Sequence, residues 1–148
     1  RVIKKVAEGG TWGGEPDMDD AMRYILNNVN ENSYLFLISD FIGLDEGWEN
    51  SLKMVSSKLN DVVGIMVRDI RDEELPEGAG RFRVEDPYSD NTIVLNLDKA
   101  KDDFEEIAEE QVEEVQEKFR RSDAGFVKVR TTDPFVNSLV QEMRLRKF

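Results

Sequence analysis

Three strand patterns divide the chain, and each ends on polar residues. The first two are apolar throughout, and runs of this kind are typical of parallel strands that are buried on both faces. The three patterns cover residues 34–39, 62–67 and 126–130, and Asp40, Arg68–Asp69 and Thr131–Asp133 follow them. Because parallel strands end at a common edge of a sheet, the pattern predicts that these polar residues gather at one edge.

Four stretches outside the strand patterns repeat apolar residues at three- and four-residue steps, which predicts amphipathic helices. They cover about residues 18–29, 48–59, 98–122 and 135–147. In the last two helices we expect Ile107, Phe135 and Val140 to face inward, and we expect Asp133 to cap the final helix. Trp48 is expected in the core.

Residues 81–85 alternate apolar and polar residues, and after a turn-rich segment residues 92–96 resume an extended pattern. This predicts a hairpin appended to the parallel sheet. Two parallel strands joined through a helix make a βαβ unit, so the fold class is α/β. The length of 148 residues indicates a single domain over residues 1–148. Residues 1–7 resemble the end of a helix without its beginning, and we expect a truncated domain.

Charge and missing residue types exclude several classes of function. The net charge is −12, from 20 basic and 32 acidic side chains, which disfavours nucleic acid and anionic membranes as partners. The chain contains neither cysteine nor histidine, so disulfides, thiolate nucleophiles, Ser-His-Asp triads and zinc sites of those residues are excluded. Carboxylates, hydroxyls, lysines and hard cations with oxygen ligands remain.

The predicted binding edge combines the strand ends with a glycine-rich loop. Carboxylates and hydroxyls that meet there could hold Mg²⁺ or Mn²⁺, with Asp40 as the candidate metal ligand. A simpler interpretation is that polar strand ends only face solvent. The glycine loop lacks the spacing of phosphate-binding motifs, which favours a structural turn. The edge residues are Gly13, Gly14, Asp17, Ser39, Asp40, Asp69, Thr131 and Asp133.

Glutamates follow the outer faces of the predicted helix at about residues 98–122. A solvated face is the default interpretation, and a docking surface for a basic partner is the alternative.

Several of these segments together resemble a known family. They are residues 13–17 (GGEPD), 35–41 (LFLISDF), 61–69 (DVVGIMVRD), 74–76 (ELP) and 131–135 (TTDPF). The chain resembles the carboxyl-terminal part of a prokaryotic, von Willebrand factor A-like family of unknown function, often encoded beside MoxR-type AAA+ ATPases. The resemblance implies a three-layer, Rossmann-like sheet that lacks its first strand here.

The resemblance also bears on metal binding and assembly. It places Asp40 at the aspartate that ligates the metal from the third loop of von Willebrand A domains. Pro16 stands at the position of the second-loop threonine, and the first ligand loop has no counterpart, so the resemblance implies only a remnant of the site. The missing first strand would leave the edge of strand 34–39 open, which predicts a homo-oligomer.

The leading functional hypothesis is a non-enzymatic protein-interaction module that acts with a MoxR-type ATPase in protein assembly or remodelling. A Mg²⁺-dependent hydrolase that uses Asp40 with Asp69 or Asp133 is the first alternative. A structural oligomer is the second. We expect a cytoplasmic location for this chain, although the resemblance implies that a longer form can carry a membrane anchor.

Overall fold

A computed structural model of the chain describes residues 17–44, 46–76, 80–85 and 92–146. The predicted loop with Gly13 and Gly14, and the predicted helix end at residues 1–7, lie outside these ranges. The elements are helix α2 (Met18–Asn28), strand β1 (Tyr34–Ser39), helix α3 (Trp48–Lys58), strand β2 (Asp61–Arg68), the 3₁₀ turn η1 (Ile70–Asp72), strands β3 (Arg81–Glu85) and β4 (Thr92–Asn96), helix α4 (Leu97–Arg121), strand β5 (Gly125–Arg130) and helix α5 (Val136–Leu145).

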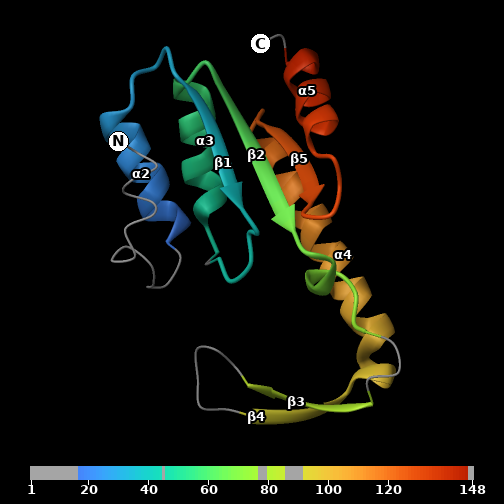
Figure 1. The fold of residues 1–148 in the computed structure, drawn as a ribbon. Coiled ribbons are helices and arrows are strands. Elements are labelled where there is room, and N and C mark those ends of the chain that lie inside the picture. Colours follow the sequence, from blue (N-terminus) through green and yellow to red (C-terminus); the bar gives the residue numbers. More distant parts are fainter. Residues whose placement is uncertain (1–16, 45, 77–79, 86–91, 147–148) are drawn as a thin grey trace, which may run out of the picture.

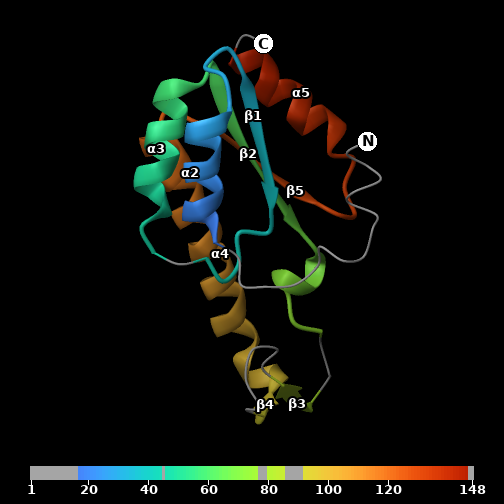
Figure 2. The same cartoon turned by 90° about the vertical axis from the view of Figure 1, so that its left-hand side faces the viewer.

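The parallel sheet has the strand order β1-β2-β5, with β2 in the centre. Helices α2, α3 and α4 cover one face of this sheet, and α5 covers the other (Figures 1 and 2). The α/β class and the parallel sheet predicted from the sequence are therefore confirmed. Strand β2 is buried along almost all of its length because it has a strand on each side and helices on both faces.

The larger core lies between the sheet and helices α2, α3 and α4. The rings of Phe41 and Trp48, and those of Phe41 and Phe119, lie with their centroids 6.2 and 5.5 Å apart, and all three side chains are buried. Phe119 packs directly on the backbone of β2 at Gly64, where a Cβ atom would lie only 2.4 Å from the ring. A smaller core under α5 contains Val63, Ile65 and Val129, with Leu139 of the helix packed against it.

The predicted burial of both faces of β1 is wrong. Its residues alternate between half-buried and exposed, and the exposed set includes Phe36 at 42% and Ile38 at 69%. Leu35 and Leu37 pack on the larger core. The reason is position: β1 is an edge strand among the described residues, and α5 packs over β2 and β5 rather than over β1.

Three expected inward side chains also point to solvent. Ile107 of α4 is 64% exposed, because the first half of this helix extends past the end of the parallel sheet (Figure 1). Phe135 and Val140 are 51% and 39% exposed. Leu139 is the residue of α5 that contacts the smaller core, so only a narrow stripe of that helix is covered. The predicted packing of Trp48 is confirmed.

The predicted hairpin forms, but it does not join the parallel sheet. Strands β3 and β4 pair antiparallel as a separate two-stranded sheet at the beginning of α4, away from β1, β2 and β5 (Figure 1). Strand β4 continues directly into the helix, and the N–H of Leu97 donates to the carbonyl of Gly80 at 2.9 Å. The hairpin is therefore attached to the helix and not to the sheet.

Within the described ranges, β1 has a strand partner on one side only. The homo-oligomer expected from such an edge stays a prediction. None of the helices described is both long enough and apolar enough to cross a membrane.

Candidate functional site

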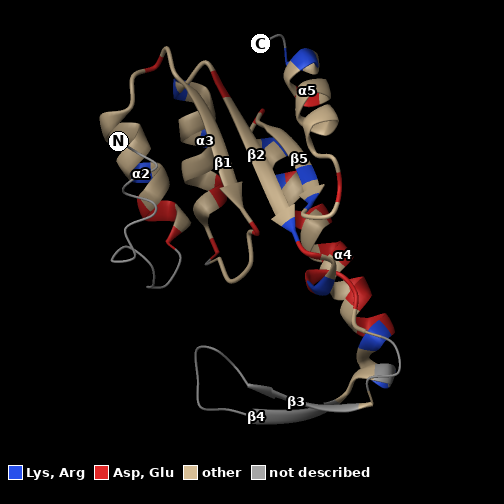
Figure 3. Ribbon diagram, in the orientation of Figure 1, with Lys and Arg blue, Asp and Glu red and all other residues tan. Residues whose placement is uncertain are grey.

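Those residues of the predicted binding edge that the structure describes lie at one end of the sheet, and a binding role for them stays a prediction. Strands β1, β2 and β5 run parallel, so Ser39–Asp40, Asp69 and Thr131–Asp133 all follow strand ends on the same side of the sheet (Figure 1). Helix α2 also begins on that side, which brings Asp17 to the same end of the molecule. Figure 3 shows acidic residues at this edge.

Asp69 and Thr131 are in direct contact across the ends of β2 and β5. The hydroxyl of Thr131 donates to Oδ2 of Asp69 at 3.0 Å, and the Thr131 N–H donates to the carbonyl of Arg68 at 2.9 Å. Oδ1 of Asp69 accepts the N–H of Arg71, and Asp69 thereby caps the beginning of the η1 turn. The hydrogen bond from Arg71, followed by that from Thr131, holds the pKa of Asp69 below its ordinary value. Asp69 therefore links the segment that follows β2 to the segment that follows β5.

Ser39 and Asp40 form a tight turn at the end of β1. Ser39 Oγ accepts the N–H of Phe41 at 3.0 Å, and Asp40 Oδ1 accepts the N–H of Ile42 at 3.1 Å. Phe41 adopts a positive φ of 55°, which is unusual for a bulky residue, and its ring is 2% exposed. The Ser-Asp-Phe step thus anchors the end of β1 in the core and leaves the Asp40 carboxylate exposed.

Asp17 and Asp133 occupy more local positions. Oδ1 of Asp17 accepts the N–H of Asp20 at 2.8 Å and so caps helix α2. Asp133 does not cap the final helix as predicted: the N-cap of α5 is Phe135, without a side-chain cap. The chain makes a turn before the helix begins, in which the N–H of Asp133 donates to the carbonyl of Arg130. The Asp133 carboxylate instead lies 3.3 Å from the hydroxyl of Thr132, which donates to it.

The described residues do not assemble a metal site. Among them, no group of three or more acidic side chains is arranged to hold a metal ion. Asp40 and Asp69 each use a carboxylate oxygen to accept a backbone N–H in their own turns. A role of Asp40 in binding Mg²⁺ or Mn²⁺ stays a prediction that these residues alone do not support.

Each strand end at this edge also carries an exposed apolar side chain close to its aspartate. Ile42 follows Asp40 and is 48% exposed. Ile70 follows Asp69 and is 43% exposed. Phe135, after Asp133, is 51% exposed. The edge therefore presents carboxylates and apolar surface together.

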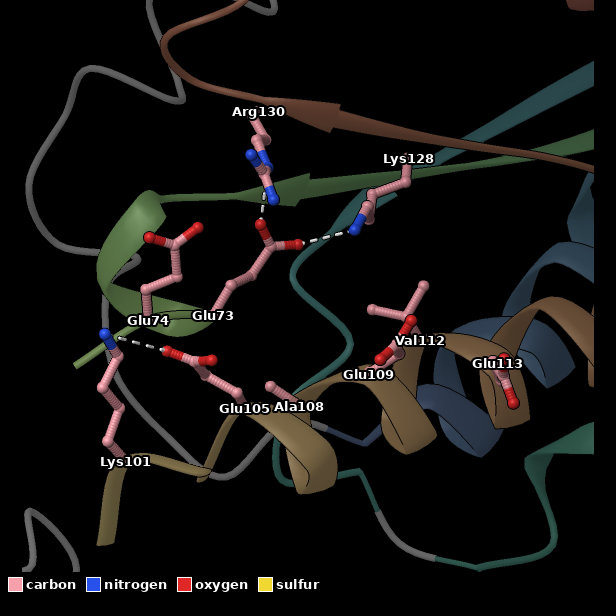
Figure 4. A pocket seen from close by; sticks show the side chains of 10 residues that line it. All are labelled: Glu73, Glu74, Lys101, Glu105, Ala108, Glu109, Val112, Glu113, Lys128 and Arg130. Atoms are coloured by element: carbon pink, nitrogen blue, oxygen red, sulfur yellow. Dashed lines mark hydrogen bonds and ion pairs between the residues drawn. The ribbon is translucent and has the colours of Figure 1, made fainter. Parts of the chain in front are cut away.

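A pocket next to this edge was not expected from the sequence. It has a volume of about 470 Å³ and lies between the ends of β2 and β5, the η1 turn and helix α4 (Figure 4). Glu73, 8% exposed, binds Nζ of Lys128 at 2.7 Å and Nε of Arg130 at 2.6 Å. Burial alone would raise the pKa of Glu73, but the hydrogen bond and charge of Lys128, together with the charge of Arg130, lower it overall.

The outer wall of the pocket is acidic. Helix α4 contributes Glu105, Glu109 and Glu113, and Lys101 lies 3.9 Å from Glu105 (Figure 4). The glutamates on this helix were expected to be either a solvated face or a docking surface. In the structure, part of that row forms one side of a pocket whose opposite side combines Glu73 and Glu74 with Lys128 and Arg130.

The burial of Arg68, like that of Glu73, was not predicted from the sequence. Arg68 is the last residue of β2 and is only 2% exposed, although the pattern predicted a polar strand end in the binding edge. The period of two along β2 could have identified it, because Val62, Met66 and Arg68 fall on one face. Val62 and Met66 belong to the larger core.

The fold and this edge define the class as an α/β domain with an open parallel sheet and a polar carboxyl-terminal edge. Within that class, the chain belongs to the family described as protein of unknown function DUF58, which it matches over residues 1–114. The match ends inside α4, so β5 and α5 lie beyond it. No curated protein matches the chain. No solved structure matches it either.

Proposed function

We propose that the chain is a non-enzymatic protein-interaction module, and that it binds its partner through the carboxyl-terminal edge of the sheet. The observation that carries the proposal is the repeated pairing of a carboxylate with exposed apolar surface at three strand ends. The pairs are Asp40 with Ile42, Asp69 with Ile70 and Asp133 with Phe135. Protein interfaces combine apolar contact area with polar groups that fix orientation.

Charge indicates the kind of partner. A chain with a net charge of −12 and carboxylates at its binding edge attracts a surface with basic residues and repels acidic ones. The resemblance to von Willebrand A-like proteins encoded beside MoxR-type AAA+ ATPases supports such an ATPase as the partner, in the assembly or remodelling of other proteins.

The first experiment measures the affinity between the purified chain and the MoxR-type ATPase encoded nearest to it, by biolayer interferometry. Two edge variants are compared with the wild type: Ile42→Ser, which removes exposed apolar surface, and Asp40→Asn, which removes charge and keeps the acceptor of the turn. Each is expected to weaken binding about tenfold, the effect of losing one central contact.

Leu145→Ser is the matched control, because Leu145 is also an exposed aliphatic residue, but it precedes Arg146, which binds Asp61 at the start of β2, the end of the strand opposite to the edge. It should bind like the wild type. Absence of binding by the wild-type chain would overturn the choice of partner. Equal affinities for all variants, or an equal loss with Leu145→Ser, would overturn the choice of surface.

A further inference from the structure

Arg68 has an unusual environment for an arginine. It ends β2 on the face covered by the larger core, and 2% of its surface is exposed. Its Nε and Nη2 atoms are buried and have no hydrogen-bond partner. Burying a guanidinium is costly when its donors lack acceptors, so this position calls for an anion.

The two unpaired donors identify the shape of that anion. The Nε–H and one Nη2–H lie along the same edge of the planar guanidinium and point in the same direction, which matches two oxygens of a carboxylate or phosphate. Two other arginines of the chain bind carboxylates through the same pair of N–H groups. Arg146 binds Asp61 through Nε at 2.9 Å and Nη2 at 2.6 Å, and Arg120 binds both oxygens of Glu117 in the same way.

The neighbours of Arg68 add positive charge. Arg130 of β5 is its register partner, and Lys128 stands two residues earlier on the same face of that strand. Glu73 is the buried carboxylate of this region, and it pairs with Lys128 and Arg130. Three cations thus face one buried carboxylate at the ends of β2 and β5, and Arg68 is the cation that Glu73 does not bind.

We propose that Arg68 is the centre of a binding site for a small anion with two free oxygens, a carboxylate or a phosphate group. Arg68 does not itself line the pocket, so the anion passes between Lys128 and Arg130, which do, and then accepts hydrogen bonds from Nε and Nη2 of Arg68. The opposite wall, with Glu105, Glu109 and Glu113 of α4, repels anions, and it repels a polyanion such as nucleic acid more strongly than a single small anion.

The test measures thermal unfolding of the chain at pH 7 in sodium phosphate, sodium acetate or sodium chloride of equal ionic strength. Anion binding to the folded state should raise the melting temperature by about 5 °C at a tenfold excess over the dissociation constant. The Arg68→Met variant, which keeps a side chain of similar length, should lose this increase. Arg120→Met is the control, because Arg120 is exposed on α4, and it should keep the increase.

General salt effects on stability are the same in all three proteins and cancel in the comparison. An increase in phosphate alone assigns the site to phosphate groups, and an increase in acetate assigns it to carboxylates. Equal shifts for the wild type and Arg68→Met would overturn the proposal, as would no shift in either salt.

A second measurement does not depend on the folding of the variant. In ¹⁵N-labelled wild-type protein, the Nε–H resonance of Arg68 should move on titration with the effective anion and saturate with the same dissociation constant. A resonance that does not move at saturating phosphate and acetate would refute the site.

Discussion

Replacing Gly64 by alanine should strongly destabilise the protein. The added Cβ would lie 2.4 Å from Cζ of Phe119, and ordinary contacts begin at 3.4 Å, so the ring must move by 1.0 Å, the difference of the two. Phe119 has no free direction, because it is fully buried and lies against Phe41 and Phe126, each 5.5 Å away between centroids. Overpacking of this kind costs about 1–3 kcal/mol, of which the better strand propensity of alanine returns about 0.5–1 kcal/mol. Because the ring cannot move aside, the upper end of this range applies, and we expect a net loss of about 2 kcal/mol.

Urea unfolding, followed by circular dichroism, measures this loss in two backgrounds. In Phe119→Leu the ring is absent, so Gly64→Ala should cost at least about 1 kcal/mol less there than in the wild type. Gly80→Ala is the control: its cost arises from a positive φ of 69° with open space around the glycine, and it should be the same in both backgrounds. A cost of Gly64→Ala below about 0.5 kcal/mol, or the same cost in both backgrounds, would refute this account of the core.

Two further predictions concern ion pairs. Glu73→Gln should lower the free energy of unfolding at neutral pH by about 1–2 kcal/mol, less than for fully buried pairs because Lys128 and Arg130 are more than a third exposed. Because the folded-state pKa of Glu73 is lowered, its contribution is present above the ordinary pKa and disappears as the pH falls through the folded one. Urea unfolding should therefore show the difference shrinking in acid, and a constant difference would contradict the reasoning. Arg146→Met removes the bond from Arg146 to Asp61 beside α5, so amide hydrogen exchange in α5 should accelerate relative to an Arg144→Met control; equal rates would show that this ion pair does not hold the helix.

The hydrophobic pattern predicted the elements well, because most of them have strong periodicity and clear ends. It could not distinguish β1 from β2. Both runs are apolar, but their burial depends on which helices cover them, and that is decided by contacts between distant segments. The predicted burial of Ile107 failed for the same reason. Its spacing fits the inner face of α4, but this part of the helix does not lie over the parallel sheet.

The candidate site was predicted in part. Parallel topology was enough to bring Asp40, Asp69 and Thr131 to one edge, and the bond between Asp69 and Thr131 depends on it. The roles of Arg68 and Glu73 were not predicted, because a charged residue after an apolar run is normally solvated. Glu73 is buried because the chain after the η1 turn places it against Lys128 and Arg130 of β5, an arrangement that no local pattern encodes.

Helix α4 also acts as a lever arm. Its 25 residues span about 37 Å at 1.5 Å per residue, and only its second half is held in the core by Val115 and Phe119. The hairpin of β3 and β4 is mounted on the other end (Figure 1). From Val115 the helix extends about 27 Å back to Leu97, so a tilt of about 10° there would displace the hairpin by about 5 Å. A small change in the packing around Phe119 that tilts α4 would therefore move the hairpin by several times the displacement at Phe119 itself.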